Sequence, residues 1–207
     1  MPQPPPNFLI VNNYARNPSR ITELYQAVKT VTGFPPIIAW YRELLYLDLQ
    51  RFDGLILSGS EAMLSEHPTQ QEFAPTMSTL RRCRKPILGI CYGHQLLGAT
   101  FGGTVIRLPQ KIEGFHPVTL LNQDPLFDEL PRSFQAAQSH SEVVESLMPD
   151  FHHLARAEAY PVEAVRHRSR PIWGVQFHPE RSTEEHPFGR KILLNFTRIV
   201  ADSREPR

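Results

Sequence analysis

Residues 89–95 read GICYGHQ and place one cysteine between two glycines, directly after the apolar run at residues 86–88. A nucleophile on a tight turn between a strand and a helix is the arrangement of the hydrolase nucleophile elbow. Gly89 and Gly93 lack a Cβ, so the turn can close tightly and a substrate can approach the backbone. The N–H groups that begin the following helix favour negative charge on a sulfur at the turn. The segment therefore predicts that Cys91 is a nucleophile.

A second motif supplies the groups that a cysteine nucleophile needs. Residues 172–180 read IWGVQFHPE, in which an apolar strand ends at His178 and a carboxylate follows at Glu180. A thiol nucleophile requires a base that exchanges its proton, and the base requires a partner that fixes its tautomer. Taken singly, His178 would suit a hydrogen-bonded strand end and Glu180 a solvated acid. Together with Cys91, they predict a catalytic triad in the order Cys, His, Glu.

These two motifs resemble those of the class I (triad) glutamine amidotransferases, and the likeness runs from about residue 8 to about residue 200. In that family the cysteine attacks the side-chain amide of glutamine and releases ammonia. The γ-glutamyl thioester that forms is then hydrolysed by water. The resemblance implies that L-glutamine is the substrate, that Cys91, His178 and Glu180 are catalytic, and that neither a metal nor an organic cofactor takes part.

The resemblance also implies an oxyanion hole after the apolar strand at residues 54–57. The sequence Ser58-Gly59-Ser60 lies where the family has a glycine-rich loop, although it would be a plain turn in most proteins. The backbone N–H of Gly59 or Ser60, together with that of Tyr92, is expected to stabilise the oxyanion, and losing one such donor costs roughly 2.7–4 kcal/mol. Members related to GMP synthetase carry Ser-Gly-Gly-Pro here, so Ser60-Glu61 departs from their pattern.

Further residues are expected to bind glutamine. Gln95 lies one turn after Cys91, where the resemblance implies a substrate contact and the alternative is a polar residue of the first helical turn. The sequence Ser139-His140-Ser141-Glu142 is similar to a Ser-His segment of GMP synthetase glutaminases, which holds the α-amino and α-carboxylate groups of glutamine. The alternative for residues 139–142 is a serine turn that caps a helix beginning near residue 143. Ser60 completes the predicted substrate-binding set.

The carboxy-terminal half is most similar to the glutaminase of GMP synthetase, in residues 139–144, 161–165 and 171–180. The chain reaches only residue 207 and contains no phosphate-binding loop, so we expect a free-standing glutaminase that delivers ammonia to a separate synthase subunit, with a GMP synthetase partner as the best guess. One alternative is a self-sufficient hydrolase of γ-glutamyl compounds. Another is a non-catalytic regulatory protein, which the intact triad disfavours.

Composition narrows the class of protein further. The 207 residues are 41% hydrophobic and 21% charged, with a net charge of +1, as in ordinary globular domains. Neither nucleic acid nor an anionic membrane is a favoured partner at that charge, and no apolar run reaches the roughly 18 residues of a membrane helix. The start, MPQPPP, has no signal-peptide character. Two cysteines and no zinc-ligand spacing suit a cytoplasmic protein with reduced thiols.

Strands and helices alternate along the first half, which predicts an α/β fold with a doubly wound, mostly parallel sheet and helices on both faces. Expected strands are residues 8–11, 37–40, 54–57 and 87–90, and expected helices are about 19–32, 41–49, 70–84 and 187–200. Shorter strands at 104–108, 115–121, 134–137, 154–157 and 163–165 predict a small antiparallel addition. We expect a flexible proline-rich leader at residues 1–7, one domain at 8–201 and a tail at 202–207. Ligands of such sheets bind beyond the carboxyl ends of the strands.

Overall fold

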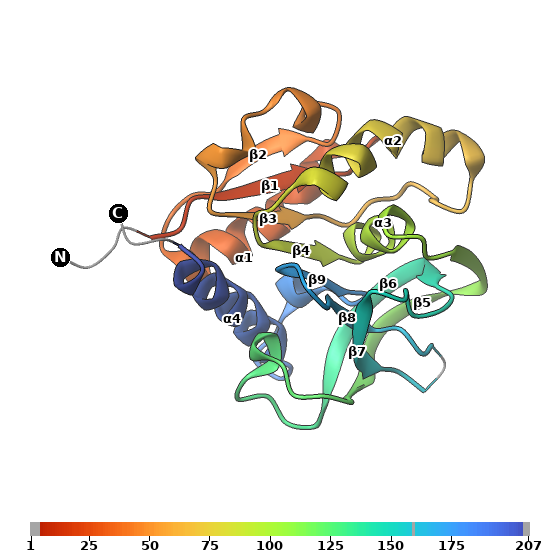
Figure 1. Ribbon diagram of the computed structural model, residues 1–207. Coiled ribbons are helices and arrows are strands. Elements are labelled where there is room, and N and C mark those ends of the chain that lie inside the picture. The colour runs from red at the N-terminus through yellow and green to blue at the C-terminus, as the bar shows by residue number, and fades with distance from the viewer. Residues whose placement is uncertain (1–4, 159, 205–207) are drawn as a thin grey trace.

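A nine-stranded sheet organises the residues that the computed structural model describes, 5–158 and 160–204 (Figure 1). The strand order is β2-β1-β3-β4-β9-β8-β7-β5-β6, and neighbours in the first five are parallel. Four of the five strands are apolar throughout or nearly so and buried on both faces, as parallel strands covered by helices must be. The parallel strands are β1 (Phe8–Asn12), β2 (Ile37–Trp40), β3 (Gly54–Leu57), β4 (Ile87–Ile90) and β9 (Ile172–Val175).

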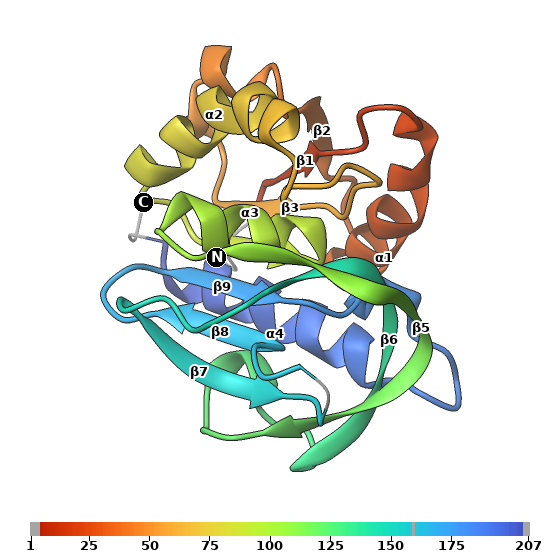
Figure 2. The same ribbon diagram turned by 90° about the vertical axis from the view of Figure 1, so that its right-hand side faces the viewer.

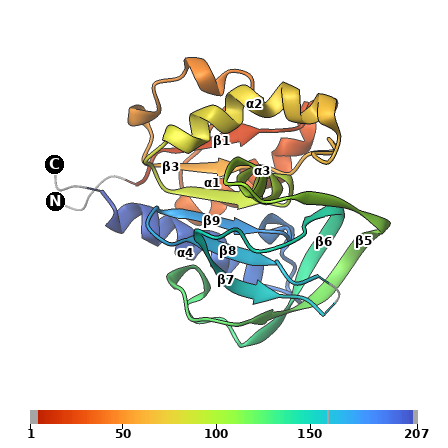
Figure 3. The same ribbon diagram turned by 45° about the vertical axis from the view of Figure 1, so that its right-hand side comes forward.

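The second half of the sheet is antiparallel. Beyond β9 lie β8 (Ala164–His167), β7 (Phe151–Arg156), β5 (Val105–Leu120) and β6 (Ser133–Val144). The β5–β6 pair is long, and it curves past the carboxyl ends of the central strands (Figures 2 and 3). The antiparallel part therefore forms one wall of the region where the predicted site residues lie.

Helices cover both faces of the parallel strands. On one face α1 (Thr22–Thr32) and α4 (Phe188–Asp202) pack against each other and against one hydrophobic cluster of the core. On the other face α2 (His67–Arg82) and α3 (Tyr92–Thr100) pack against a second cluster. Short 3-10 turns are η1 (Pro18–Ile21), η2 (Leu44–Tyr46), η3 (Leu49–Arg51), η4 (Pro125–Phe127) and η5 (Pro179–Arg181).

The predicted fold class is confirmed, and three local predictions are wrong. Residues 41–49, expected to be a helix, form the 3-10 turns η2 and η3 instead. The strands expected at 104–108 and 115–121 are one strand, β5, whose register shifts between Arg107 and Ile112. The helix-capping alternative for residues 139–142 is also wrong, because β6 continues to Val144, where its β-branched residues pair with Val105 and Ile106.

The predicted leader and tail fall partly outside the described residues, which begin at residue 5 and end at residue 204. Asn7, placed in the leader, is tied to the sheet: its N–H donates to the Asp53 carboxylate at 2.8 Å and its carbonyl accepts the Asp53 N–H at 2.9 Å. No helix in the described part of the chain is long and apolar enough to cross a membrane.

Candidate active site

Cys91 occupies a strained turn between β4 and α3. Its φ of 51° and ψ of −105° lie outside the regions that side chains ordinarily adopt, at a cost of order 1–3 kcal/mol. The Cys91 N–H donates to the carbonyl of Val175 at 2.8 Å, which ties the turn to β9. A Cβ on Gly93 would lie 2.4 Å from the Leu57 carbonyl oxygen, and one on Gly89 would lie 2.6 Å from the Gly93 carbonyl oxygen. The elbow therefore needs its glycines for close backbone packing, as the sequence indicated.

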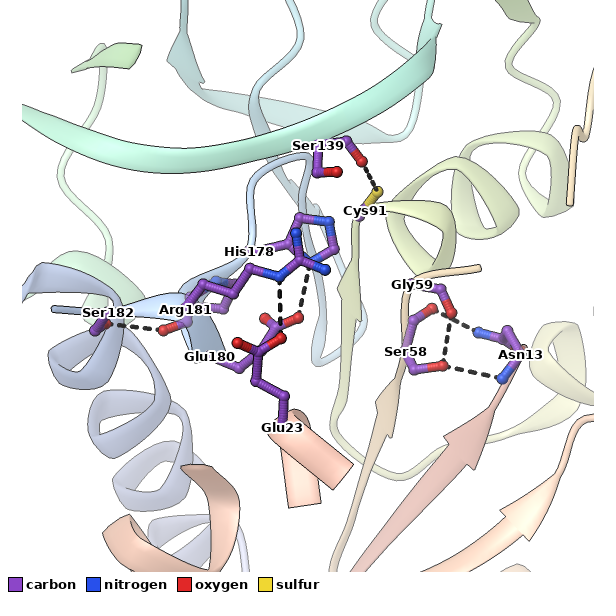
Figure 4. A network of polar contacts seen from close by, with 11 residues as sticks. Asn13, Glu23, Ser58, Gly59, Cys91, Ser139, His178, Glu180, Arg181 and Ser182 are labelled. Carbon is purple, nitrogen blue, oxygen red and sulfur yellow. Dashed lines mark hydrogen bonds and ion pairs between the residues drawn. The ribbon is translucent and has the colours of Figure 1, made fainter. Parts of the chain in front are cut away.

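His178 and Glu180 form a buried pair beside this turn (Figure 4). His178 follows β9 and Glu180 lies in η5, and their Nδ1 and Oε1 atoms are 2.7 Å apart. The side chains are only 3% and 4% exposed. The His178 N–H also donates to the Ala137 carbonyl at 2.8 Å, so β6 helps to fix the position of the histidine.

Electrostatics in this pair favours the charged histidine. Burial lowers the pKa of His178, but the Glu180 carboxylate and Cys91 outweigh burial and raise that pKa to about 10. Burial raises the pKa of Glu180, and His178 more than reverses this, so that the net direction is downward. An imidazolium held against a carboxylate is thus the state expected near neutral pH.

The free edge of the imidazole faces the nucleophile. Figure 4 shows the His178 ring between Glu180 and Cys91. Its Nε2 is buried and makes no hydrogen bond within the described residues, so it is available to exchange a proton with the sulfur. The Cys91 Sγ lies 3.9 Å from the Ser139 carbonyl oxygen, which marks β6 as the opposite wall of the site. The structure thus brings the three predicted triad residues together.

The loop after β3 presents backbone N–H groups toward this site. The N–H of Gly59 makes no hydrogen bond among the described residues, and that of Tyr92 begins α3 and has no acceptor within the helix. Gly59 lies against the triad, because a Cβ there would stand 3.1 Å from His178 Cε1. Ser58 anchors the loop: its Oγ accepts the Asn13 N–H at 2.9 Å and donates to the Gly59 carbonyl at 2.8 Å.

A cavity of about 180 Å³ opens next to Cys91. It contains every residue predicted to bind substrate, although their side chains do different things. The Ser60 hydroxyl donates to the Asn13 carbonyl and accepts the Ala62 N–H, so it shapes the loop. Gln95 donates to the Glu142 carbonyl at 2.6 Å. The lining residues are Arg20, Ser60, Glu61, Ala62, Met63, Cys91, Gln95, Lys111, Ser139, His140, Ser141 and Glu142.

The residues of β6 line the same cavity in two ways. Ser139 and Ser141 are half-buried and reach its surface, whereas His140 and Glu142 are buried. The Glu142 carboxylate accepts the N–H groups of Leu64 at 2.6 Å and Ser65 at 3.0 Å. Glu142 therefore joins β6 to the loop before α2, which forms the facing wall.

Four residues near the site were not singled out from the sequence as site residues. Arg20, Lys111 and Glu61 line the cavity, and one Glu61 oxygen accepts the Arg16 N–H while the other is buried without a hydrogen-bond partner among the described residues. The hydroxyl of Tyr14 lies 3.1 Å from the Cβ that Gly59 lacks. Burial, together with Glu180 and Cys91, raises the pKa of Tyr14 to about 12. The only signal for any of them was the departure from the family pattern at Ser60-Glu61.

A model of the family described as glutamine amidotransferase class-I matches residues 10–199, nearly the whole chain. The chain belongs to the class I glutamine amidotransferases. Among the described residues of this amidotransferase, no group of three or more His, Cys, Asp or Glu side chains could hold a metal ion.

Relatives of this amidotransferase carry more specific names. The glutamine-hydrolyzing GMP synthase subunit of Pyrococcus abyssi is 44% identical over 117 residues, which are 56% of this chain and 61% of that protein. The subunit of the same name from Methanocaldococcus jannaschii is 36% identical over 146 residues, 70% of this chain and 73% of that protein. The chain thus spans about three fifths of the length of the first of these relatives.

Solved structures show the same fold. A protein from Thermoplasma acidophilum, described as a GMP synthase subunit, superposes with a TM-score of 0.84 at 24% identity, covering 97% of this chain and 96% of that one. A glutamine amidotransferase from Thermotoga maritima gives a TM-score of 0.75 at 17% identity, covering 95% and 98%.

Proposed function

We propose that this chain hydrolyses the side-chain amide of L-glutamine through a thioester on Cys91 and supplies the ammonia to a separate synthase, of the GMP synthetase type. The observation that carries the proposal is the strained turn that presents Cys91 next to the buried His178–Glu180 pair. Backbone strain at a cysteine, beside a histidine whose tautomer is fixed by a carboxylate, is the constellation of an activated thiol nucleophile.

In the proposed reaction the Cys91 sulfur forms a bond to Cδ of glutamine. His178 gives its Nε2 proton to the amide nitrogen, the Cδ–N bond breaks, and ammonia leaves. Water then attacks Cδ, His178 takes a proton from it, and the Cδ–S bond breaks to release glutamate and restore the thiolate. The N–H groups of Gly59 and Tyr92 stabilise the two tetrahedral oxyanions, because donors fixed in advance need no reorganisation during the reaction.

The cavity beside Cys91 suits one amino acid. Its volume of about 180 Å³ is below the roughly 300–1,000 Å³ of pockets for drug-sized ligands. The cavity holds two cations, Arg20 and Lys111, and one carboxylate, Glu61, whose second oxygen is buried without a partner among the described residues. We assign the α-carboxylate of glutamine to the cations and its α-ammonium to Glu61, with the β6 backbone around Ser139 and Ser141 along its side. This compact, zwitterion-matched cavity favours free glutamine over γ-glutamyl peptides.

Support for a synthase partner comes from the relatives. Proteins whose names give them as one glutamine-hydrolyzing subunit of GMP synthase share 36–44% identity with the matched parts of this chain. A protein named as one subunit implies another subunit that completes the synthase. Ammonia is volatile and basic, so we infer that this chain releases it only when the acceptor subunit is bound.

The test measures ammonia release from L-glutamine by the purified chain, alone and with an archaeal-type GMP synthetase ATP-pyrophosphatase subunit. We expect little release by the chain alone, labelling of Cys91 by a glutamine-like chloroketone, and release that rises when the second subunit is added. Rapid release without a partner, extending to γ-glutamyl peptides, would support the self-sufficient hydrolase. No labelling of Cys91 and no release under either condition would contradict the glutaminase.

A further inference from the structure

A buried chain of polar side chains runs behind the β6 wall of the cavity. The Glu163 Oε2 lies 2.9 Å from the side-chain nitrogen of Gln138, and the Gln138 side-chain oxygen lies 3.1 Å from Nε2 of His140. The Nδ1 of His140 lies 3.1 Å from the Glu142 carbonyl oxygen. Glu163 is 0% exposed, and Gln138 and His140 are 3% and 4% exposed. Buried polar groups at such depth must satisfy one another.

The donors and acceptors of this chain allow two arrangements. The Glu142 carbonyl only accepts, so Nδ1 of His140 must carry hydrogen. With the Gln138 oxygen facing Nε2, that nitrogen must donate too, which requires an imidazolium balanced by a Glu163 carboxylate. With the amide turned by 180°, Nε2 accepts from the Gln138 nitrogen, and the Gln138 oxygen requires a hydroxyl on Glu163. Both arrangements hold the same number of protons.

Burial selects between these arrangements. A separated charge pair in a water-free interior costs more than neutral groups that are fully hydrogen-bonded. Burial lowers the pKa of His140 to about 4 and raises the pKa of Glu163 to about 7. Both directions favour the neutral arrangement, in which the proton is on Glu163 and the histidine is uncharged.

The chain is coupled to the reacting groups through the β6 backbone. Ser139, whose carbonyl is 3.9 Å from the Cys91 sulfur, lies between Gln138 and His140 in the sequence. The Glu142 carbonyl that accepts from His140 also accepts from Gln95. A shift of His140 would therefore move the wall against which glutamine is expected to lie.

We infer that Glu163 is a positioning residue, which in its protonated form holds His140 through Gln138 and so fixes the β6 wall of the glutamine cavity. This inference rests on the proposed function. When Glu163 loses its proton, the Gln138 amide must turn its nitrogen to the carboxylate. The amide oxygen then faces the lone pair of His140 Nε2, and that repulsion loosens the wall. Binding of glutamine should weaken as pH rises through the pKa of Glu163, while the chemical step changes little.

Other titratable groups face this chain, and the test must separate them from Glu163. A second cavity of about 210 Å³ against Glu163 is lined by His116 of β5 and by Glu158 and Tyr160 from the segment before Glu163. His140 is also near His94 of α3 and His178. Glu158 is exposed and lines the same cavity, so Glu158→Gln is a matched control that removes one carboxylate without touching the chain.

The experiment compares wild type, Glu163→Gln, Glu163→Leu and Glu158→Gln by labelling of Cys91 with the glutamine-like chloroketone from pH 5.5 to 8.5, resolved into KI and kinact. Glu163→Gln keeps every hydrogen bond of the neutral chain, so we expect its KI to match wild type at low pH and to lose the rise at high pH. Glu163→Leu leaves the Gln138 oxygen unpaired and should raise KI about tenfold at all pH values with little change in kinact. Glu158→Gln should follow wild type.

A KI in Glu163→Gln as poor as in Glu163→Leu at low pH would indicate the ion pair and overturn the inference, as would identical pH profiles for wild type and Glu163→Gln. The free energy of unfolding supplies a readout that needs no glutamine. Stability of wild type relative to Glu163→Gln should fall between about pH 4.5 and 7, the two ends of the pKa change of Glu163. If that fall is seen but the chloroketone never labels wild type, the proposed function fails and the protonated Glu163 stands.

Discussion

The carboxylate of Glu142 accepts the backbone N–H of Leu64 at 2.6 Å, which joins strand β6 to the loop before α2. A second bond, from the Ser65 N–H at 3.0 Å, uses the other carboxylate oxygen. The two walls of the cavity beside Cys91 are therefore held together by one buried side chain. The acid seen in the sequence as a glutamine ligand spends both oxygens on the protein's own backbone.

Replacing Glu142 by alanine should loosen the cavity and destabilise the protein. The change leaves two backbone N–H groups without an acceptor, so we expect the free energy of unfolding to drop by about 1–3 kcal/mol. The KM for glutamine should rise more than kcat falls. Urea unfolding followed by circular dichroism measures the first effect. Glu145→Ala, at an exposed position just past β6, is the control, and equal stability losses in both variants would refute the anchoring role.

Substitutions at Cys91 separate chemistry from strain. Cys91→Ala and Cys91→Gly should both abolish ammonia release and chloroketone labelling. Because φ at this position is 51°, glycine should relieve a strain that alanine retains, making the glycine variant more stable by about 1 kcal/mol. Thermal unfolding of the two variants provides the comparison. An alanine variant that still turns over glutamine would remove Cys91 from the mechanism.

Glu180→Gln should lower the pKa of His178, because the carboxylate is the main group that holds it up. The wild-type protein keeps the stability contributed by the charged histidine below about pH 6.5 and loses it as pH approaches about 10. Relative to Glu180→Gln, wild type should therefore lose free energy of unfolding across that interval. Labelling of Cys91 near pH 7.5 should slow in the variant. Parallel stability curves for the two proteins would show that the pair does not carry this charge.

Lys111→Met should weaken glutamine binding without changing the chemical step. The cation lines the cavity but is not in contact with the triad in the proposed reaction, so its loss removes binding common to the ground and transition states. We expect KM to rise roughly tenfold and kcat to stay within a factor of about two. Arg107→Met, on the same strand but outside the cavity lining, controls for the loss of charge. Equal KM values for both variants would place the α-carboxylate elsewhere.

The parts of this fold that the sequence predicted are those in which local pattern and tertiary role agree. The apolar strands β1, β3, β4 and β9 lie at the predicted residues, because a strand buried on both faces is continuous in hydrophobicity. The Cys91 turn and His178 could be located for a related reason: the sequence at each is compatible with few other structures.

What the sequence did not predict depends on contacts between distant segments. Ser141 and Glu142 read locally as a turn, yet the pairing of Arg107 with Glu142 makes them strand. The inclusion of Arg20 and Lys111 in the cavity depends on how η1 and the irregular part of β5 fold over β6, for which no periodicity exists. The same is true of Glu163, whose neighbours Gln138 and His140 belong to another strand.

The position of β9 has a consequence for biosynthesis. Of the nine strands of the sheet this one is the last to leave the ribosome, yet it lies in the middle, where Gly174 pairs with Gly89 of β4 and Val175 pairs with Ile90. Until β9 is inserted, β4 has an open edge and the cysteine beyond it has no histidine. A nascent or truncated chain would therefore carry a thiol that cannot yet consume glutamine, and the last insertion step of folding would also be the step that arms the enzyme.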